Sequence, residues 1–239
     1  MGRKMTPNRN HSDGILKRSS ISRETANLFL SALLNGDRHA CWAIVKRQLD
    51  EGMSISDLYI KLFQPALYLV GELWERNAIS VATEHMATAI IEAQMSQLYP
   101  QFVSPHPNGC RSMVTTVEGE THRVGARMVC DFFEMHGWDG QFLGSDIPQR
   151  ELIRLIRESP PDILGISFTM FFNYGLLCDM LDDIQTEFPD LKTLIGGQAA
   201  RRVDSRIRDQ FPDVSIIRSL KDLERFLSSY PAPQDSTKN

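Results

Sequence analysis

The β-branched run Met113–Val117 leads directly into the loop Glu118-Gly119-Glu120-Thr121-His122-Arg123-Val124-Gly125. The run predicts a strand, and apolar residues at helical spacing follow the loop as far as His136. The loop is therefore expected at the carboxyl end of a strand, which is the edge where open α/β sheets bind ligands. A histidine there can hold a ligand, although a lone loop histidine is more often a polar residue with no such task.

The composition is that of an ordinary globular protein, with 239 residues, 42% apolar residues and a net charge of −4. The acidic balance does not favour wholesale nucleic-acid binding. The chain has no apolar run of about 18 residues and no signal-peptide pattern, so we expect a cytoplasmic protein with no membrane span. The cysteines lack the spacing of a disulfide framework or a zinc site and are expected to be reduced thiols: Cys41, Cys110, Cys130 and Cys178.

The N-terminal part of the sequence predicts a four-helix bundle over residues 22–99. It is preceded by a basic arm, residues 1–21, which we interpret as a flexible solvated tail; contact with an acidic partner or with DNA is the less favoured alternative. Helix starts are expected at serines and breaks at Asn35–Asp37 and Gly52, with a kink at Pro65 and a left-handed end at Asn77. The capping candidates are Ser22, Ser54 or Ser56, and Ser80.

Residues 100–110 are rich in proline and predict a linker, after which strand and helix patterns alternate over residues 111–230, before a loose tail at 231–239. This alternation predicts an α/β domain with a five-stranded parallel sheet of the flavodoxin-like kind. Strands are expected at Met113–Val117, Gly140–Gly144, Asp162–Thr169, Leu191–Ile195 and Val214–Arg218. Helices are expected at Val124–His136, Gln149–Glu158, Tyr174–Phe188, Ala199–Gln210 and Lys221–Ser228.

Chemistry-bearing residues follow three of these strands, in the loops Glu120-x-His122-x-x-Gly125, Ser167-Phe168-Thr169 and Gly196-Gly197. In a flavodoxin-like sheet these three strands are neighbours, so we expect their loops to share one rim. His122 can ligate a metal through one ring nitrogen while the other donates to Glu120. One histidine and one carboxylate cannot close a tetrahedral metal site. A metal that brings its own equatorial ligands, as in a tetrapyrrole-like cofactor, needs only one protein ligand.

These loops resemble the cobalamin-binding domain shared by methionine synthase, corrinoid proteins and mutases, whose pattern is D-x-H-x-x-G, then S-x-L, then G-G. This chain differs by Glu120 in place of Asp and Thr169 in place of Leu. The resemblance implies that His122 is the lower axial ligand of cobalt and that Glu120 orients it. It further implies a groove for the nucleotide tail of the cofactor, formed by Gly125, Ser167, Gly196 and Gly197. Contacts to the tail are expected from Thr169 or Asn173, and Met170, Phe171 and Phe172 line the groove unless they pack in the core.

Trp74, followed after nine residues by Glu84-His85, resembles the helical cap of the LitR/CarH cobalamin photoreceptors. Taken alone, Trp74 would be a core residue and Glu84-His85 a solvated helix face. The resemblance implies that Trp74 lies over the upper face of adenosylcobalamin and that the polar pair bonds the adenosyl group. Glu75 occupies the position where those photoreceptors often have a histidine, so the upper ligand after illumination would be water, hydroxide, as in hydroxocobalamin, or another residue such as His85.

The predicted bundle begins at about residue 22, which leaves no room for an N-terminal helix-turn-helix domain, and in this respect the chain resembles the AerR/PpaA antirepressors of photosynthetic bacteria. That resemblance implies a non-enzymatic, light-responsive cobalamin-binding regulator whose partner is a redox-responsive repressor of photosynthesis genes. Direct DNA contact is not the expected mode. One alternative is a corrinoid protein that carries a methyl group between methyltransferases. Another is an interaction scaffold that binds no cofactor.

Overall fold

The computed structural model describes residues 20–230, and the chain forms two compact units, Met1–Ile91 and Glu92–Asn239. We call them the helical unit and the sheet unit and describe each by itself. The predicted basic arm, apart from its last two residues, and the predicted C-terminal tail lie outside the described residues.

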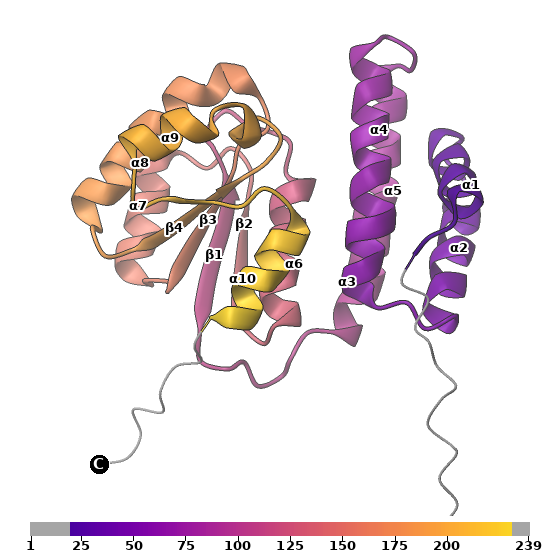
Figure 1. Ribbon diagram of the computed structural model, residues 1–239, viewed down its shortest axis with the longest axis horizontal. Coiled ribbons are helices and arrows are strands. Elements are labelled where there is room, and N and C mark those ends of the chain that lie inside the picture. Colours follow the sequence, from indigo (N-terminus) through magenta and orange to yellow (C-terminus); the bar gives the residue numbers. More distant parts are fainter. Residues whose placement is uncertain (1–19, 231–239) are drawn as a thin grey trace, which may run out of the picture. The chain divides into compact units, whose positions relative to one another are not determined.

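The helical unit consists of helices connected by short turns (Figure 1). Helix α5 begins in this unit and ends in the sheet unit, since the division falls between Ile91 and Glu92. The segments are α1 Arg23–Leu34, α2 Arg38–Asp50, α3 Ile55–Leu58, the π-helical η1 Tyr59–Phe63, α4 Gln64–Glu75 and α5 Val81–Leu98.

Serine caps start these helices, as the sequence predicts. The hydroxyl oxygens of Ser22, Ser54 and Ser80 accept backbone N–H groups three residues ahead, at 3.0, 3.1 and 3.1 Å. Ser54 rather than Ser56 opens the third predicted helix. Asn77 adopts the expected left-handed conformation, with φ of 56°.

The third predicted helix contains an irregular turn next to Pro65, where the sequence predicted a kink. Segments α3, η1 and α4 follow one another without a break, and the π-helical turn ends two residues before the proline. Proline has no N–H, and its ring crowds the carbonyl four residues earlier, here that of Lys61. The wider π-helical turn relieves this crowding while the helix continues.

Aromatic side chains form the centre of the helical unit. Phe29, Tyr59 and Phe63 are fully buried, and the rings of Phe29 and Phe63 stack with centroids 5.9 Å apart. Trp74, on the last turn of α4, is by contrast 36% exposed. The largest aromatic side chain of α4 therefore lies at the surface and does not belong to the buried core.

The sheet unit contains a five-stranded parallel sheet with the order β2-β1-β3-β4-β5, which confirms the predicted flavodoxin-like arrangement (Figure 1). The strands are β1 Arg111–Thr116, β2 Asp139–Gly144, β3 Ile163–Ser167, β4 Lys192–Gly196 and β5 Ser215–Ile216. The helices are α6 Val124–Met135, α7 Gln149–Glu158, α8 Tyr174–Glu187, α9 Asp204–Gln210 and α10 Leu220–Ser229, with short 3₁₀ turns η2 Tyr99–Gln101, η3 Phe171–Asn173 and η4 Ala200–Arg202.

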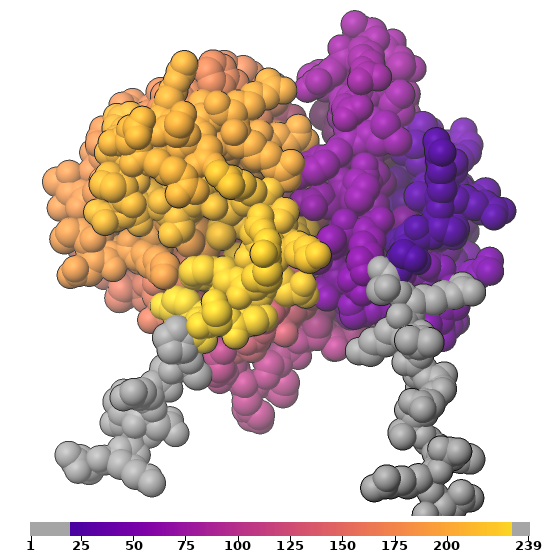
Figure 2. Space-filling model, in the orientation of Figure 1, coloured from indigo at the N-terminus to yellow at the C-terminus, as the bar shows by residue number. Residues whose placement is uncertain are grey.

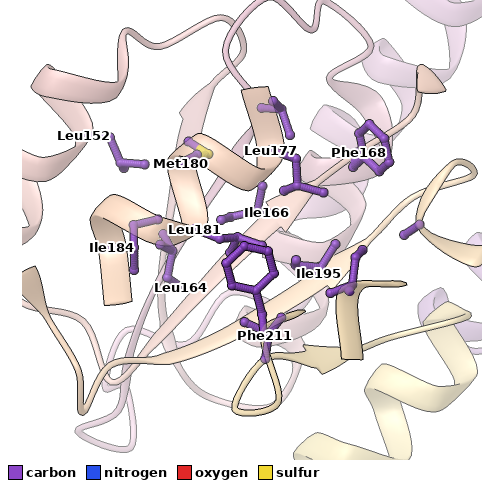
Figure 3. Packing of buried hydrophobic residues seen from close by; sticks show 14 of the residues in the cluster. Leu152, Leu164, Ile166, Phe168, Leu177, Met180, Leu181, Ile184, Ile195 and Phe211 are labelled. Carbon is purple, nitrogen blue, oxygen red and sulfur yellow. The ribbon is translucent and has the colours of Figure 1, made fainter. Parts of the chain in front are cut away.

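An extended apolar cluster of the sheet unit lies between the strands and helices α7, α8 and α9 (Figure 3). Leu164 and Ile166 of β3 meet Leu181 of α8, and Phe211 closes the cluster after α9. Burial of this continuous apolar surface fixes the strand ends, and with them the loops that follow each strand.

Two predicted elements differ from the structure. The expected helix Ala199–Gln210 is divided into η4 and α9, because Val203 leaves the helical conformation with φ of −118° and ψ of 11°. The expected strand Val214–Arg218 is reduced to Ser215–Ile216, which pairs only with β4. An edge strand has a ladder on one side only, so fewer of its residues are held extended.

A partly buried carboxyl group joins the segment after α5 to helix α6. The Tyr99 hydroxyl donates to Glu134 Oε1 at 3.0 Å, whereas Glu134 Oε2 is buried with no hydrogen-bond partner among the described residues. Burial is the main cause that raises the pKa of Glu134 to about 6, and the negative charges of Asp131 and Asp139 raise it further. The hydrogen bond from Tyr99 and the charge of Arg127 act in the opposite direction and lower the pKa.

Glu134→Gln is expected to make the protein more stable than the wild type above pH 6. The folded pKa of about 6 lies above the usual value of 4.5, so the contribution of Glu134 to the stability of the wild type falls as pH rises between these two values. Because Glu134 is only partly buried, we expect the loss to be about 1 kcal/mol. Urea unfolding at pH 4 and pH 8 measures it, with exposed Glu158→Gln as control; equal pH dependence in wild type and Glu134→Gln would contradict this account.

Candidate functional site

The loops that follow β1, β3 and β4 lie along one edge of the sheet. Strand β3 pairs with β1 on one side and with β4 on the other, so the carboxyl ends of the three strands are adjacent. The sequence predicted this shared rim, and the pairing confirms it. The candidate ligand His122 and the candidate groove residues are therefore carried by neighbouring strands.

Glu120 and His122 form a directly bonded pair at this rim. The Nδ1 atom of His122 contacts Glu120 Oε1, which also accepts the backbone N–H of His122 at 3.1 Å. Glu120 Oε2 accepts the backbone N–H groups of Met170 at 2.9 Å and Thr169 at 3.3 Å. One carboxylate thus holds the histidine and the loop after β3 together. The glutamate at position 120, where the family pattern has aspartate, reaches both the His122 ring and the backbone of the loop after β3.

The two members of this pair differ sharply in burial. Glu120 is 1% exposed, whereas the side chain of His122 is 46% exposed. Burial favours the neutral form of Glu120, but the hydrogen bonds from His122 and from the Met170 backbone outweigh it and hold the pKa of Glu120 below its usual value. An ionised carboxylate at Nδ1 keeps the proton on that nitrogen, so Nε2 is the nitrogen suited to ligate a metal.

The loop that carries this pair is held by Asp146, which lies in the loop after the neighbouring strand β2 and which the sequence analysis did not single out. Asp146 Oδ1 accepts the backbone N–H of Gly119 at 2.9 Å, and the backbone N–H of Asp146 donates to Thr116 Oγ1 at 3.2 Å. Thr116 Oγ1 in turn donates to the carbonyl of Glu120 at 2.9 Å. Asp146 has φ of 57°, a left-handed conformation that aspartate tolerates better than most residues. The sequence signal that could have identified this residue is its position, since Asp146 is an aspartate two residues after Gly144, the glycine that ends β2.

Asp146→Ala is expected to loosen the histidine loop and to destabilise the protein by about 1–2 kcal/mol, because the Gly119 N–H loses its acceptor and alanine is strained at this φ. Faster hydrogen exchange at the Gly119 amide, together with urea unfolding, measures the change. Asp146→Asn keeps an acceptor and tolerates the left-handed conformation, so it should stay close to wild type. Unchanged exchange at Gly119 in Asp146→Ala would show that Asp146 does not hold the loop.

The four predicted groove residues occupy two places on the rim. Gly125, at the start of α6, faces Ser167 at the end of β3, since a Cβ atom built on Gly125 would lie 3.8 Å from Ser167 Oγ. A Cβ built on Gly196 would meet the Ile217 carbonyl at an ordinary 3.5 Å. At Gly197, where φ is 107°, a Cβ would lie 2.2 Å from the Phe168 carbonyl oxygen. The close approach of two loops, which sequence reasoning did not foresee, therefore requires a glycine at 197.

The loop after β3 carries the remaining candidates. Thr169 and Met170 take part through their backbone N–H groups. Phe171 and Phe172 are exposed and not core residues, with Phe172 at 74%, although the Phe171 ring stacks on Tyr174. Asn173 is buried, and its Nδ2 has no hydrogen-bond partner among the described residues. A buried amide N–H₂ without a protein acceptor suits a ligand that brings acceptor oxygens to this rim.

The predicted cap residues belong to the first turns of α5 and the last turn of α4 in the helical unit. His85 Nδ1 contacts Glu84 Oε2, and Glu84 Oε1 accepts the Thr88 hydroxyl at 3.0 Å. The side chain of His85 is 76% exposed. Glu84 and His85 thus form a polar pair at the surface of their unit, and the indole of Trp74 is exposed on the same unit.

The described residues contain no group of three or more His, Cys, Asp or Glu side chains that could hold a metal ion. A metal at His122 must therefore bring most of its own ligands. Three features fit a metal held in a macrocycle with a polar tail. The Nε2 of His122 is oriented by Glu120, two small residues face each other at Gly125 and Ser167, and the buried side-chain amide of Asn173 lacks an acceptor among the described residues. Within residues 20–230, no helix is both long and apolar enough to cross a membrane.

Comparisons with known proteins agree with this geometry. Residues 25–99 match one family profile described as "B12 binding domain", and residues 110–218 match a second profile with the same description. The monomethylamine corrinoid protein of Methanosarcina barkeri has the same fold, with a TM-score of 0.74 at 18% identity over 86% of this chain and 98% of that one.

Among curated proteins, the HTH-type transcriptional repressor CarA of Myxococcus xanthus is 27% identical over 66% of this chain and 54% of its own length. Dimethylamine corrinoid protein 1 of Methanosarcina acetivorans is 25% identical over 71% of this chain and 81% of its own length. The chain spans about half the length of CarA and of its relative CarH. The chain therefore belongs to the B12-binding proteins: it is a cobalamin-binding protein in which a helical B12-binding domain is followed by an α/β B12-binding domain.

Proposed function

We propose that this protein is a light-responsive transcriptional regulator of the antirepressor type. It holds cobalamin through His122 and changes its contact with a partner repressor when the upper axial ligand is lost. The proposed partner is a redox-responsive repressor of photosynthesis genes. The observation that carries the proposal is the exposed indole of Trp74, on the same unit as the Glu84–His85 pair.

A flat aromatic ring and a polar pair are the groups that an adenosyl moiety needs. The indole face stacks on adenine, and a carboxylate or imidazole bonds ribose hydroxyls or the adenine edge. A methyl group offers neither contact. The composition of the cap therefore favours adenosylcobalamin as the dark ligand and hydroxocobalamin after illumination.

Bound cobalamin would supply a cobalt–carbon bond that light cleaves. The residues of this chain would convert that cleavage into a change of shape. Trp74, Glu84 and His85 would lose their contacts to the adenosyl group when it departs, while His122 and Glu120 would keep the cofactor in place. A ligand shifts a protein between two states only through its different affinity for each, and loss of a large upper group is an adequate difference.

A corrinoid methyl carrier is the second candidate. The two-domain fold covers 98% of the monomethylamine corrinoid protein, and dimethylamine corrinoid protein 1 aligns over 81% of its length. CarA and CarH, whose names describe transcriptional repressors, share the sequence at slightly higher identity over about half of their length. The upper ligand that the protein prefers separates the two functions.

Trp74→Ala is expected to bind adenosylcobalamin about tenfold more weakly in the dark and to bind methylcobalamin as the wild type does, because only adenine stacks on the indole. Titrations followed by absorption, before and after illumination, measure both affinities. Leu28→Ala removes another exposed apolar side chain of the helical unit and serves as control. Preference for methylcobalamin, or no light-dependent change in partner binding, would favour the carrier.

A further inference from the structure

Arg123, the residue directly after the proposed cobalt ligand His122, forms an ion pair with Glu92 of α5. Arg123 Nε donates to Glu92 Oε1 at 2.9 Å, and Nη2 donates to Oε2 at 3.3 Å. A bidentate pair of this kind is stronger and more directional than a single charged contact. The side chain of Glu92 is 18% exposed and that of Arg123 is 55% exposed, so water screens the pair only in part. Both residues belong to the sheet unit.

Arg123 lies at the junction between the histidine loop and α6. It is the N-cap residue of this helix, and its carbonyl accepts the backbone N–H of Arg127 at 2.9 Å, although its side chain makes no capping hydrogen bond. The body of α6 is fixed independently, because Phe132 and Phe133 are fully buried and α10 (Figure 2, yellow) packs against it. The side chain of Arg123 therefore supports the loop and not the helix as a whole.

The pair with Glu92 supports the histidine loop from the side that the other bonds leave open. The hydrogen bonds to the loops after β2 and β3 hold Gly119 and Glu120, and Glu120 in turn holds the backbone N–H of His122. The bonds from Arg123 act on the residue that follows His122. His122 thus lies between two supports, and a metal ligand keeps its productive geometry only when the residues around it are held in place.

We propose that Arg123 is a positioning residue for cobalt ligation by His122, and that its pair with Glu92 joins the histidine loop to α5. This inference rests on the proposed role of His122 as lower axial ligand, and it depends neither on light nor on a partner protein. Helix α5 also carries Glu84 and His85, about two turns before Glu92. One helix therefore bears both the residues proposed for the upper face and the carboxylate that is bonded next to the proposed lower ligand.

Arg127 provides a matched control, because it makes a similar contact between the same two helices. Arg127 Nη2 donates to Ser96 Oγ at 3.1 Å, one turn beyond the pair of Arg123 with Glu92 on each helix. Arg127 lies within α6 and not at its junction with the loop. Arg127→Gln removes the same charge and a contact between α5 and α6, so it separates a general loosening of the helices from an effect on His122.

Absorption spectra of the full-length protein with adenosylcobalamin and with methylcobalamin, both in the dark, test the proposal. We expect Arg123→Gln to bind about three- to tenfold more weakly than the wild type and to hold a larger fraction of the cofactor without histidine ligation, because outer-shell groups typically change metal affinity by up to about 10- to 100-fold and Arg123 acts one step further out. Arg123→Lys keeps the charge but not the fork and should fall between the two. In the cofactor-free protein, we expect faster hydrogen exchange at the His122 amide in Arg123→Gln.

A double-mutant cycle shows whether the two side chains act together. Glu92→Gln should reproduce the loss, and Arg123→Gln/Glu92→Gln should lose no more than either single variant, since the pair is already broken. Thermal melting checks that each variant folds. The proposal is overturned if Arg123→Gln keeps the affinity and spectrum of the wild type, if the two single losses add in the double variant, or if Arg127→Gln causes an equal loss.

The same spectra distinguish this inference from the proposed function. A wild-type spectrum without histidine ligation, unchanged in His122→Ala, would overturn both the proposed site and the role of Arg123. A histidine-ligated wild type whose ligation is lost in Arg123→Gln supports the inference, even if illumination then changes neither shape nor partner binding and the proposed regulator fails.

Discussion

His122→Ala is expected to bind cobalamin at least about 100-fold more weakly than the wild type and to lose the absorption spectrum of a histidine-ligated cobalt. Changes to groups that merely orient a metal ligand typically cost about 10- to 100-fold in affinity, so loss of the ligand itself should reach or exceed that range. A factor of about 100 corresponds to about 2.7 kcal/mol of binding free energy. Absorption spectra at increasing cofactor concentration measure both effects.

Two further variants locate the cause of the loss. Glu120→Gln keeps the side-chain length but removes the charge that fixes the His122 tautomer, so we expect about tenfold weaker binding with some histidine ligation retained. His106→Ala removes an exposed histidine outside the rim and should behave as wild type. If His122→Ala binds with unchanged affinity and spectrum, His122 is not the ligand, and the scaffold interpretation gains support.

The sequence predicted the order of the elements because their signals are local. Serine caps, glycine breaks and the β-branched run before the histidine loop each act within a few residues, and the structure places helices and strands accordingly. The shared rim of the three loops followed from the topology of parallel α/β sheets, and the pairing of β3 with β1 and β4 confirms it.

The contacts that hold the site could not be predicted in this way, because they join residues far apart in the chain. Glu120 binds the backbone N–H of Met170, 50 residues away, and Asp146 binds Gly119 across 27 residues. Periodicity carries no information on such pairs. The break at Val203 and the requirement for glycine at 197 also depend on tertiary packing, which local propensity does not encode.

Gly197→Ala is expected to destabilise the protein by about 3 kcal/mol or more. The Cβ of alanine would lie 2.2 Å from the Phe168 carbonyl oxygen and 2.7 Å from its carbonyl carbon, so backbone atoms must move. That carbonyl already accepts the Ala199 N–H at 3.2 Å, and the Phe168 N–H donates to the Gly196 carbonyl at 2.8 Å. The φ of 107° is itself costly for any residue with a Cβ atom.

Urea unfolding of the cofactor-free protein measures this loss, and Gly175→Ala is the matched control. Gly175 lies in α8, where a Cβ would meet nothing within 4 Å, so alanine should stabilise the helix by up to about 1 kcal/mol. The two Gly→Ala changes in one unit thus have opposite expected signs. Wild-type stability with weaker cobalamin binding in Gly197→Ala would mean that Gly197 serves cofactor passage. Because no cofactor is present during unfolding, a large loss of stability instead assigns the glycine to the contact between the loops after β3 and β4.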